Sequence, residues 1–195
     1  MIAQRIKRWM GREPAVDGAG DAPGDAPELS ILMVCMGNIC RSPTAEGVLR
    51  AKLEQAGLQD RVRVDSAGTI GSHAGEPPDP RAIRHAARRG YDIAGLRARP
   101  VTDEDFSRFQ WVLAMDEANL RWLHKRVPAS GSPRLDLLMA HASRHADVRE
   151  VPDPYYGTAA GFEHVLTLVE DACDGLVRHI RAELVAGAGT APKLD

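Results

Sequence analysis

Cysteine is scarce in this chain of 195 residues, in which only Cys35, Cys40 and Cys173 occur. An odd number of cysteines, without a recognisable signal peptide, argues against a disulfide framework and leads us to expect a reducing, cytoplasmic location. Long apolar runs are also missing, since the longest, residues 31–36, is far shorter than the roughly 18 residues of a membrane span. The formal net charge is only -2, so charge alone gives no reason to expect a nucleic acid as partner.

The remaining composition is that of an ordinary globular protein. Hydrophobic residues make up 44% of the chain and charged residues 27%, proportions that allow a well-filled core. The length suits a single domain. We expect this domain to cover residues 29–186 and a disordered tail to follow over residues 187–195.

Residues 1–28 differ from the rest of the chain. Residues 1–12 contain basic side chains and no acid, and their apolar residues recur at the spacing of one helical face. Residues 13–28 combine acids with many alanines, glycines and prolines, a mixture that buries too little apolar surface to order itself. We therefore predict a flexible extension over residues 1–28. Its basic part is either a frayed tail or a short amphipathic helix that makes weak contact with an anionic membrane or a partner.

Segments with the pattern of buried strands alternate with segments of helical pattern. The expected strands are 30–35, 62–66, 111–115 and 135–139, and the expected helices are 43–56, 80–89, 102–109, 118–126 and 162–184. The first strand is continuously apolar after Ser30, as in strands that are covered on both faces. This alternation predicts an α/β fold with a parallel, doubly wound sheet and helices on both of its faces. Cys173 falls on the apolar stripe of the last helix and is expected to be buried.

The most informative segment is Val-Cys-Met-Gly-Asn-Ile-Cys-Arg-Ser-Pro, at the end of the first predicted strand. The Cys-x5-Arg spacing alone is a weak motif, but here Cys35 ends a buried strand and Arg41 stands just before a predicted helix. Ser42 is expected to be the N-cap of that helix. A loop in this place can turn its amide N–H groups inward and, with the positive end of the helix, form a cradle for an anion. Gly37 and Asn38 are residue types that tolerate the positive φ of such a tight loop.

The cradle indicates chemistry at a phosphate group. Amide donors, a helix N-terminus and a guanidinium favour the thiolate form of a cysteine, which is the nucleophilic form. Arg41 can bind two phosphate oxygens and stabilise the charge that develops during phosphoryl transfer, and Ser42 can help the sulfur of Cys35 to leave. Cys40 is expected to be the redox partner of Cys35, because it lies on the same short loop and can capture its oxidised form as a disulfide. The predicted phosphate-binding loop comprises Met36, Gly37, Asn38, Ile39, Cys40 and Ser42.

The same segment resembles the signature of the low-molecular-weight protein-tyrosine phosphatases. Further segments match that family in order: Asp65-Ser66-Ala67-Gly68, Pro77-Pro78-Asp79-Pro80-Arg81, Arg97-Ala98-Arg99, Asp103-Glu104-Asp105-Phe106, Met115-Asp116-Glu117-Ala118-Asn119-Leu120 and Asp153-Pro154-Tyr155-Tyr156-Gly157. Together these segments cover about residues 30–185. The resemblance implies a small sheet of four parallel strands with helices on both faces, and it places residues 65–68 beneath the phosphate loop.

The resemblance also implies an activity, namely hydrolysis of phosphotyrosine through a cysteinyl-phosphate intermediate without a metal or another cofactor. It assigns Cys35 as the nucleophile, Arg41 as the phosphate binder and Asp153 as the general acid. An acid is needed because the leaving oxygen of tyrosine has a pKa near ~10 and must be protonated as it departs. Tyr155 and Tyr156 would form an aromatic wall for the substrate ring.

Two positions depart from the family pattern. Ser72 stands in the expected substrate wall, where the family often has an aromatic residue, and this change bears on peptide specificity. Leu96 stands where we would expect a histidine that braces the phosphate loop, and this change bears on the support of Asn38. Neither departure removes a reacting group.

Two other functions fit parts of the pattern. A thioredoxin-coupled arsenate reductase uses the same fold and cradle, but it relays a disulfide through two further cysteines, and residues 80–100 contain none. A non-catalytic phosphotyrosine-binding module would need neither the nucleophile nor the acid.

The expected partner is a tyrosine-phosphorylated protein. Bacterial members of the family commonly oppose autophosphorylating tyrosine kinases, and others act on host proteins.

No metal site is expected from the sequence. His141 and His145 are four residues apart, at the spacing of a metal-binding pair. Because no third ligand is near them in the sequence, a solvated surface is favoured for both.

Overall fold

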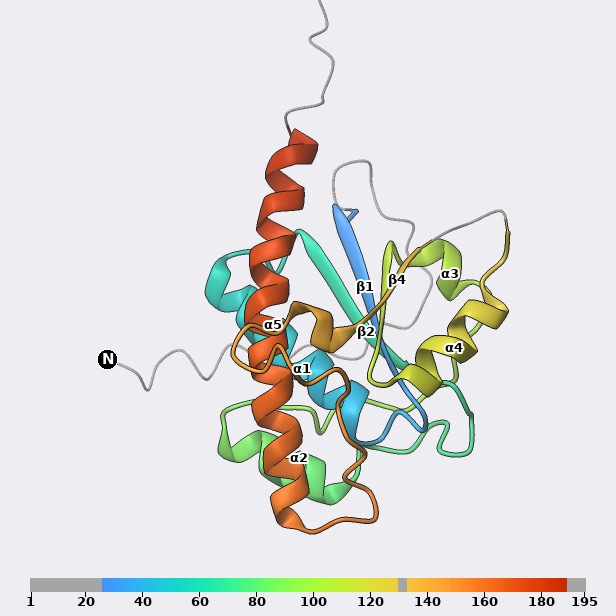
Figure 1. The fold of residues 1–195 in the computed structure, drawn as a ribbon, viewed down its shortest axis with the longest axis vertical. Helices are drawn as coiled ribbons and strands as arrows, with labels where there is room; N and C mark the ends of the chain where they lie inside the picture. Colours follow the sequence, from blue (N-terminus) through green and yellow to red (C-terminus); the bar gives the residue numbers. More distant parts are fainter. Residues whose placement is uncertain (1–25, 130–132, 189–195) are drawn as a thin grey trace, which may run out of the picture.

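The computed structural model describes residues 26–129 and 133–188. The predictions for residues 1–25 and 189–195 therefore lie outside the described part of the chain. In order, the elements are β1 (Leu29–Cys35), α1 (Arg41–Ala56), β2 (Val62–Gly68), α2 (Pro80–Arg88), α3 (Asp105–Arg108), β3 (Trp111–Ala114), α4 (Glu117–Arg126), β4 (Arg134–Leu137), the 3-10 helix η2 (Leu138–His141) and α5 (Ala159–Ala188) (Figure 1).

The four strands form one parallel sheet in the order β2-β1-β3-β4, which confirms the predicted α/β fold. All seven residues of the central strand β1 are buried. This strand pairs with β2 from Leu29 opposite Val62 to Cys35 opposite Gly68, and it pairs with β3 along its other edge. The chain thus places β2 on one side of β1 and later places β3 on the other side, so the direction of strand addition reverses at β1. Ligands of doubly wound sheets bind at this kind of switch point, beyond the carboxyl end of the strand.

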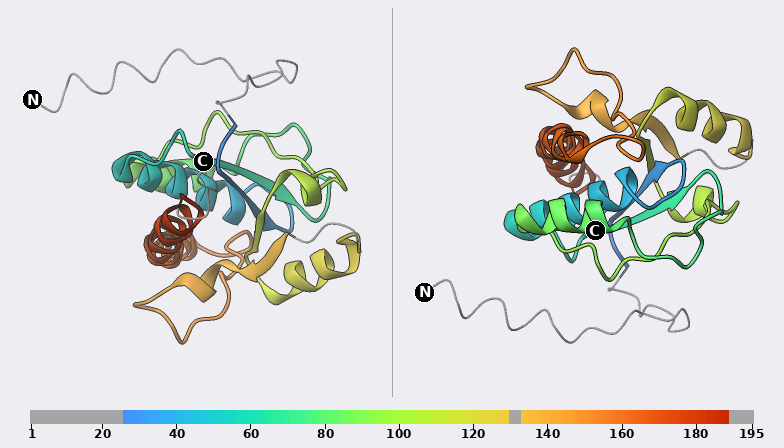
Figure 2. Two further views of the ribbon diagram at one scale, coloured as in Figure 1. Left: turned by 90° about the horizontal axis from the view of Figure 1, so that it is seen from above. Right: turned by 90° about the horizontal axis from the view of Figure 1, so that it is seen from below.

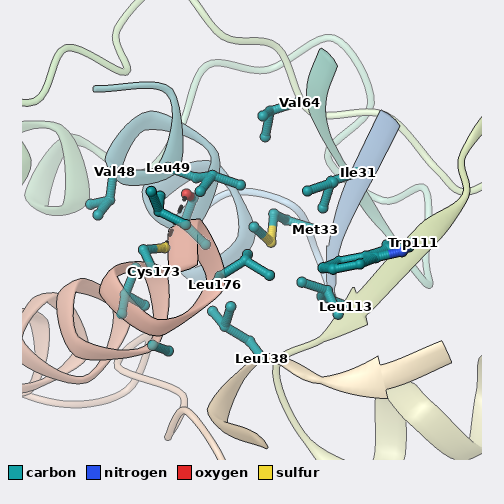
Figure 3. Packing of buried hydrophobic residues seen from close by; sticks show 14 of the residues in the cluster. Ile31, Met33, Val48, Leu49, Val64, Trp111, Leu113, Leu138, Cys173 and Leu176 are labelled. Atoms are coloured by element: carbon teal, nitrogen blue, oxygen red, sulfur yellow. Dashed lines mark hydrogen bonds between the residues drawn. The ribbon is translucent and has the colours of Figure 1, made fainter. Parts of the chain in front are cut away.

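Side chains of β1 alternate between two cores, one on each face of the sheet. Ile31 and Met33 lie in the core beneath α1 and α5, and Figure 3 shows Met33 between Ile31 and Leu176. Leu32 and Val34 lie in the core beneath α3 and α4. Figure 2 shows these two helix layers on opposite sides of the sheet. The continuous apolar run of β1 therefore has the predicted cause, burial on both faces.

Helix α5 covers much of one face and packs against α1, α2 and η2. Cys173 on this helix is fully buried, as predicted, and its sulfur lies 4.0 Å from the carbonyl oxygen of Ala45 in α1. Among the helices in the described ranges, none is long and apolar enough to cross a membrane.

Several element ends differ from the expected ones, among them both ends of α5, which runs over Ala159–Ala188 instead of residues 162–184. Helix α1 begins earlier, at Arg41, and β4 ends at Leu137, where the chain turns into η2. Helix α3 is confined to Asp105–Arg108 instead of starting at Thr102. The Asp105 carboxylate accepts a hydrogen bond from the main-chain N–H of Thr102 at 2.8 Å. The predicted capping contact is therefore present, but it forms a turn that precedes the first residue of the helix.

Candidate active site

The loop after β1 wraps around the sulfur of Cys35. This residue ends the central strand and is only 3% exposed. The N–H of Asn38 and the hydroxyl of Ser42 donate hydrogen bonds to its Sγ, at 3.2 and 3.0 Å. The thiol therefore lies at the carboxyl end of the sheet, inside the loop that the sequence predicted to bind an anion.

The predicted N-cap role of Ser42 is wrong. The N-cap of α1 is Cys40, and its side chain makes no capping hydrogen bond. The hydroxyl of Ser42 instead donates to Cys35 and accepts a hydrogen bond from the side-chain amide of Asn38 at 2.9 Å. Because a nearby sulfur and amide engage this hydroxyl, the start of the helix has no side-chain oxygen over its N–H groups. A helix start of this kind can turn those groups toward an anion.

Asn38 holds the loop in its shape. Its φ is 55°, the left-handed conformation that was predicted for this residue. The side-chain amide donates to the hydroxyls of Ser42 and Ser66 at 2.9 Å each, and the side-chain carbonyl accepts the main-chain N–H of Arg99 at 2.9 Å. The departure at Leu96 therefore does not leave Asn38 unsupported, because a main-chain donor completes its hydrogen bonding. Leu96 itself is half-buried and packs on an apolar cluster of α2 and α5.

Two glycines lie at close contacts here, and Gly68 is required for space. The prediction of a positive φ is wrong for Gly37, whose backbone is not left-handed. A Cβ at Gly37 would lie 3.2 Å from Cδ2 of His73, and a Cβ at Gly68 would lie 2.7 Å from the main-chain oxygen of Met36. The end of β2 therefore packs closely against the phosphate loop, as the resemblance implied. His73 belongs to no motif, and the sequence analysis missed it.

Glu46 is a buried acid linked to the same loop. It is 2% exposed, its Oε2 accepts the hydroxyl of Ser66 at 2.5 Å, and its Oε1 pairs with Arg50 at 2.6 Å. Burial raises the pKa of Glu46 to about 7, although Arg50 and the Ser66 hydrogen bond oppose the shift. Because Ser66 also binds Asn38, the acid connects to the phosphate loop through one side chain. No pattern in the sequence indicates this role, since a helical glutamate is normally exposed.

Arg41 is bound by two carboxylates. It is 3% exposed. One terminal nitrogen donates to Asp116 Oδ2 at 2.5 Å and to the carbonyl oxygen of Val151 at 3.3 Å, and the other donates to Asp153 Oδ2 at 2.9 Å. Burial alone would lower the pKa of this guanidinium, but the charges of Cys35, Asp116 and Asp153 outweigh burial and raise it. Arg41 therefore keeps its positive charge, and its ion pair with Asp153 holds that residue beside the phosphate loop.

The segment 153–157, which we call the acid segment, is more open. The side chain of Asp153 is 40% exposed, and its Oδ1 accepts the N–H of Tyr155 at 3.1 Å. Tyr155 is 38% exposed and Tyr156 is 95% exposed, and their rings meet edge to face with centroids 4.9 Å apart. Both rings thus lie at the surface next to Asp153, and their role as a wall for the substrate stays a prediction.

The other predicted site residues differ in burial. Met36 is 48% exposed, Ile39 is half-buried and Ser72 is exposed on the loop after β2. Cys40 is buried, and burial together with the nearby charge of Asp79 raises the pKa of its thiol. Cys40 is therefore protonated at neutral pH. The redox role of Cys40 and the wall role of Ser72 stay predictions.

The expectation of a solvated surface is wrong for His141, which is 4% exposed. Its Nδ1 lies 2.7 Å from Nδ1 of His179, and its ring stacks on Trp111. Burial and the neighbouring His179 lower the pKa of His141 to about 4, so this histidine is neutral at pH 7. His145 is bonded to the buried carboxylate of Asp171. Within residues 26–129 and 133–188, no three metal-ligating side chains come together.

A doubly wound sheet with an anion cradle beyond its central strand defines a class of phosphate-binding α/β proteins. A family model described as low molecular weight phosphotyrosine protein phosphatase matches residues 30–186, and the chain belongs to this family. It is therefore a phosphoric monoester hydrolase of the protein-tyrosine phosphatase type.

Individual relatives agree with this assignment. A low molecular weight protein-tyrosine-phosphatase of Streptomyces coelicolor is 43% identical over 157 residues, which cover 79% of this chain and 94% of that protein. Among solved structures, a protein tyrosine phosphatase of Entamoeba histolytica with Hepes in the active site matches with a TM-score of 0.76 and 35% identity, over 80% of this chain and 98% of that one. YfkJ from Bacillus subtilis matches with a TM-score of 0.75 and 34% identity, over 82% and 99%.

Proposed function

We propose that this phosphatase transfers phosphate from tyrosine first to Cys35 and then to water, with Arg41 as the phosphate binder and Asp153 as the general acid. The observation that carries the proposal is the buried sulfur of Cys35, which accepts two hydrogen bonds inside a loop whose arginine is bound to Asp153. A nucleophile, a cation and a carboxyl group are thus parts of one network, as phosphoryl transfer requires.

In the first step, the thiolate of Cys35 attacks the phosphorus atom. A sulfur–phosphorus bond forms, and the bond from phosphorus to the tyrosine oxygen breaks. Arg41 exchanges its carboxylate partners for two oxygens of the phosphate, and N–H groups of the loop bind the remaining charge. Asp153, in its protonated form, gives its proton to the departing oxygen.

In the second step, water attacks the phosphorus of the cysteinyl phosphate and Asp153 accepts the proton of this water. The sulfur–phosphorus bond breaks, and Cys35 leaves as a thiolate. The hydroxyl of Ser42, 3.0 Å from the sulfur, stabilises that thiolate and so improves the leaving group. Inorganic phosphate is released.

The disulfide relay of an arsenate reductase receives no support from the cysteines. Cys173 is fully buried in the core between the sheet, α1 and α5. A thiol in that place is closed to exchange with thioredoxin, because such exchange requires access to the sulfur.

The proposed partner is a tyrosine-phosphorylated protein, and an autophosphorylating tyrosine kinase is the first candidate because bacterial members of the family commonly oppose such kinases. The proposed location is the cytoplasm. A pull-down with the Cys35→Ser variant tests the partner, and a captured phosphoprotein should be displaced by vanadate, which competes for the phosphate loop. Capture that vanadate leaves unchanged would show binding elsewhere on the surface.

Rapid-quench trapping of the phosphoenzyme tests the mechanism. With a radiolabelled aryl phosphate and a chelator present, the protein should carry label on Cys35 during turnover, and its steady-state rate should not depend on added divalent ions. Cys35→Ser should show neither label nor turnover. Cys173→Ala, which removes a thiol outside the site, should label as the wild type does. Turnover that requires a metal, or label that persists in Cys35→Ser, would contradict the proposal.

A further inference from the structure

The main chain of Tyr155 is held by hydrogen bonds at both its N–H and its carbonyl oxygen. Its N–H donates to Oδ1 of Asp153 at 3.1 Å, and its carbonyl oxygen accepts a hydrogen bond from a terminal nitrogen of Arg81 at 3.0 Å. Arg81 lies in the first turn of α2, far from the acid segment in sequence. The side chain of the proposed general acid is thus linked to Arg81 through a single residue.

Arg81 is itself anchored to the phosphate loop. Its Nε and one terminal nitrogen bind the two carboxylate oxygens of Asp79, at 3.0 and 2.7 Å. Asp79 is 9% exposed, and its main-chain N–H donates to the carbonyl oxygen of Ile39 at 2.7 Å. A continuous chain of contacts therefore runs from Ile39 in the phosphate loop through Asp79 and Arg81 to the acid segment.

Aromatic rings hold the guanidinium of Arg81 in the required orientation. Its Cζ lies 4.8 Å from the ring centroid of Phe162 and 5.6 Å from that of Tyr155. Phe162 belongs to α5 and is 3% exposed, so it offers a fixed surface. A planar guanidinium can bind a carboxylate with two nitrogens and pack against rings at the same time, whereas the ammonium group of a lysine offers only a point charge.

We propose that Arg81 is the positioning residue of the acid segment and sets the place of Asp153 relative to the phosphate loop. The inference rests on the proposed function of Asp153 as the general acid. In the ligand-free state Arg41 also binds Asp153, but this contact is given up when Arg41 turns to the phosphate. The link through Tyr155 and Arg81 does not involve the phosphate, so it can hold the segment when the proton is transferred.

The test compares Arg81→Met with Arg81→Lys on aryl phosphates of graded leaving-group pKa. Arg81→Met should lower kcat for phosphotyrosine about tenfold, a part of what a general acid supplies, and should leave an activated nitrophenyl ester nearly unaffected. KM should change less than kcat, since the phosphate loop is intact. Arg81→Lys, which keeps the charge but not the fork, should lie between Arg81→Met and the wild type. Arg84→Met, exposed on the same helix, is the matched control and should behave as the wild type does.

A double variant separates positioning from general damage. If Arg81 acts through Asp153, then adding Arg81→Met to Asp153→Ala should cause no further loss on any substrate. An equal loss on all substrates, or a further loss in the double variant, would overturn the role of Arg81. The role of Arg81 would also be overturned if Arg81→Met had the kinetics of the wild type while Asp153→Ala showed a strong leaving-group dependence. If Asp153→Ala itself shows no leaving-group dependence, the proposed role of Asp153 fails, and the inference fails with it.

Discussion

The phosphate loop and the acid segment, to which we assign parts of the same reaction, are built in opposite ways. In the phosphate loop, Cys35 and Arg41 are 3% exposed and Ser42 is fully buried. In the acid segment, the side chain of Asp153 is 40% exposed and Tyr156 is 95% exposed. The loop is held by the sheet and by a buried hydrogen-bond network, whereas the acid segment is held by a few contacts at its edges.

This difference separates two tasks. A cradle for a phosphate group works best when its donors are fixed in advance, because no reorganisation is then needed as charge develops. A proton donor must reach an oxygen whose position and basicity vary with the substrate. We therefore expect changes in the phosphate loop to affect all substrates alike, and changes in the acid segment to affect substrates according to their leaving groups.

The largest effect is expected from Asp153→Ala. Phosphotyrosine turnover should fall by roughly 10²–10⁴, the usual contribution of general acid catalysis, because the departing oxygen of tyrosine is a strong base. An activated nitrophenyl ester should lose clearly less, and phosphate-like inhibitors should bind at least as tightly as before, because one carboxylate that competes for Arg41 is gone. Rates on a series of aryl phosphates measure this dependence. A loss of the same size on every ester would remove Asp153 from the role of proton donor and turn attention to Asp116, the other carboxylate on Arg41.

Asn38→Ala should show the opposite pattern. The change removes the side-chain hydrogen bonds to Ser42, Ser66 and the N–H of Arg99, which are worth about 1 kcal/mol each, and places a Cβ without polar compensation at positive φ. We expect kcat/KM to fall about tenfold or more for all esters alike, with a lower melting temperature. Ser66→Ala, which removes one of these bonds, should cause a smaller loss of the same kind. A strong leaving-group dependence in either variant would contradict the division of tasks between the phosphate loop and the acid segment.

A smaller effect is expected from Glu46→Gln, and it depends on pH. The pKa of Glu46 rises from 4.5 to about 7 in the folded protein, so the folded state binds more protons than the unfolded state between these pH values. Its contribution to stability is therefore greatest below pH 4.5 and is lost as the pH rises through 7. Between pH 5 and pH 8, the unfolding free energy of Glu46→Gln should gain about 2–3 kcal/mol relative to the wild type. Urea unfolding at both values measures the gain, and Glu54→Gln, exposed on the same helix, should show none.

The smallest effect is expected from removal of residues 1–28. The deletion ends before β1 and takes away no reacting group. In the described part it breaks the exposed pair of Glu28 with Arg61, a kind of contact that contributes little. Turnover of a small aryl phosphate should stay within about twofold, which steady-state kinetics on both forms will measure. A truncated protein that loses most of its activity would show that the extension supports one of the two regions.

The same contrast explains what the sequence could predict. The phosphate loop is a local feature, in which a buried strand, a short polar loop and a helix start follow one another in the chain. Its cysteine, its arginine and the left-handed Asn38 could therefore be recognised from residue types and spacing. Asp153 lies 112 positions from Arg41, and only the resemblance to a family identified it.

Three of the errors share a physical cause, since Ser42, His141 and Glu46 each have a partner that is distant or unusual. Ser42 was expected to cap a helix, but its hydroxyl bonds a sulfur. His141 was expected at the surface, but it packs against His179, which is 38 positions away. Glu46 was overlooked because its partner, Ser66, lies on a neighbouring strand. Local patterns thus predict the elements well, whereas side-chain pairing across elements depends on the finished fold.

If Arg41 binds the phosphate as proposed, its two carboxylate partners make substrate binding an exchange of anions. The resting site already holds its own negative charges in the place of the phosphate, so a ligand gains only the difference between its own interactions and those of Asp116 and Asp153. This competition limits the affinity for inorganic phosphate as much as it limits the affinity for substrate. In the proposed mechanism the carboxylates return to the guanidinium after each cycle, and this return would favour release of the product.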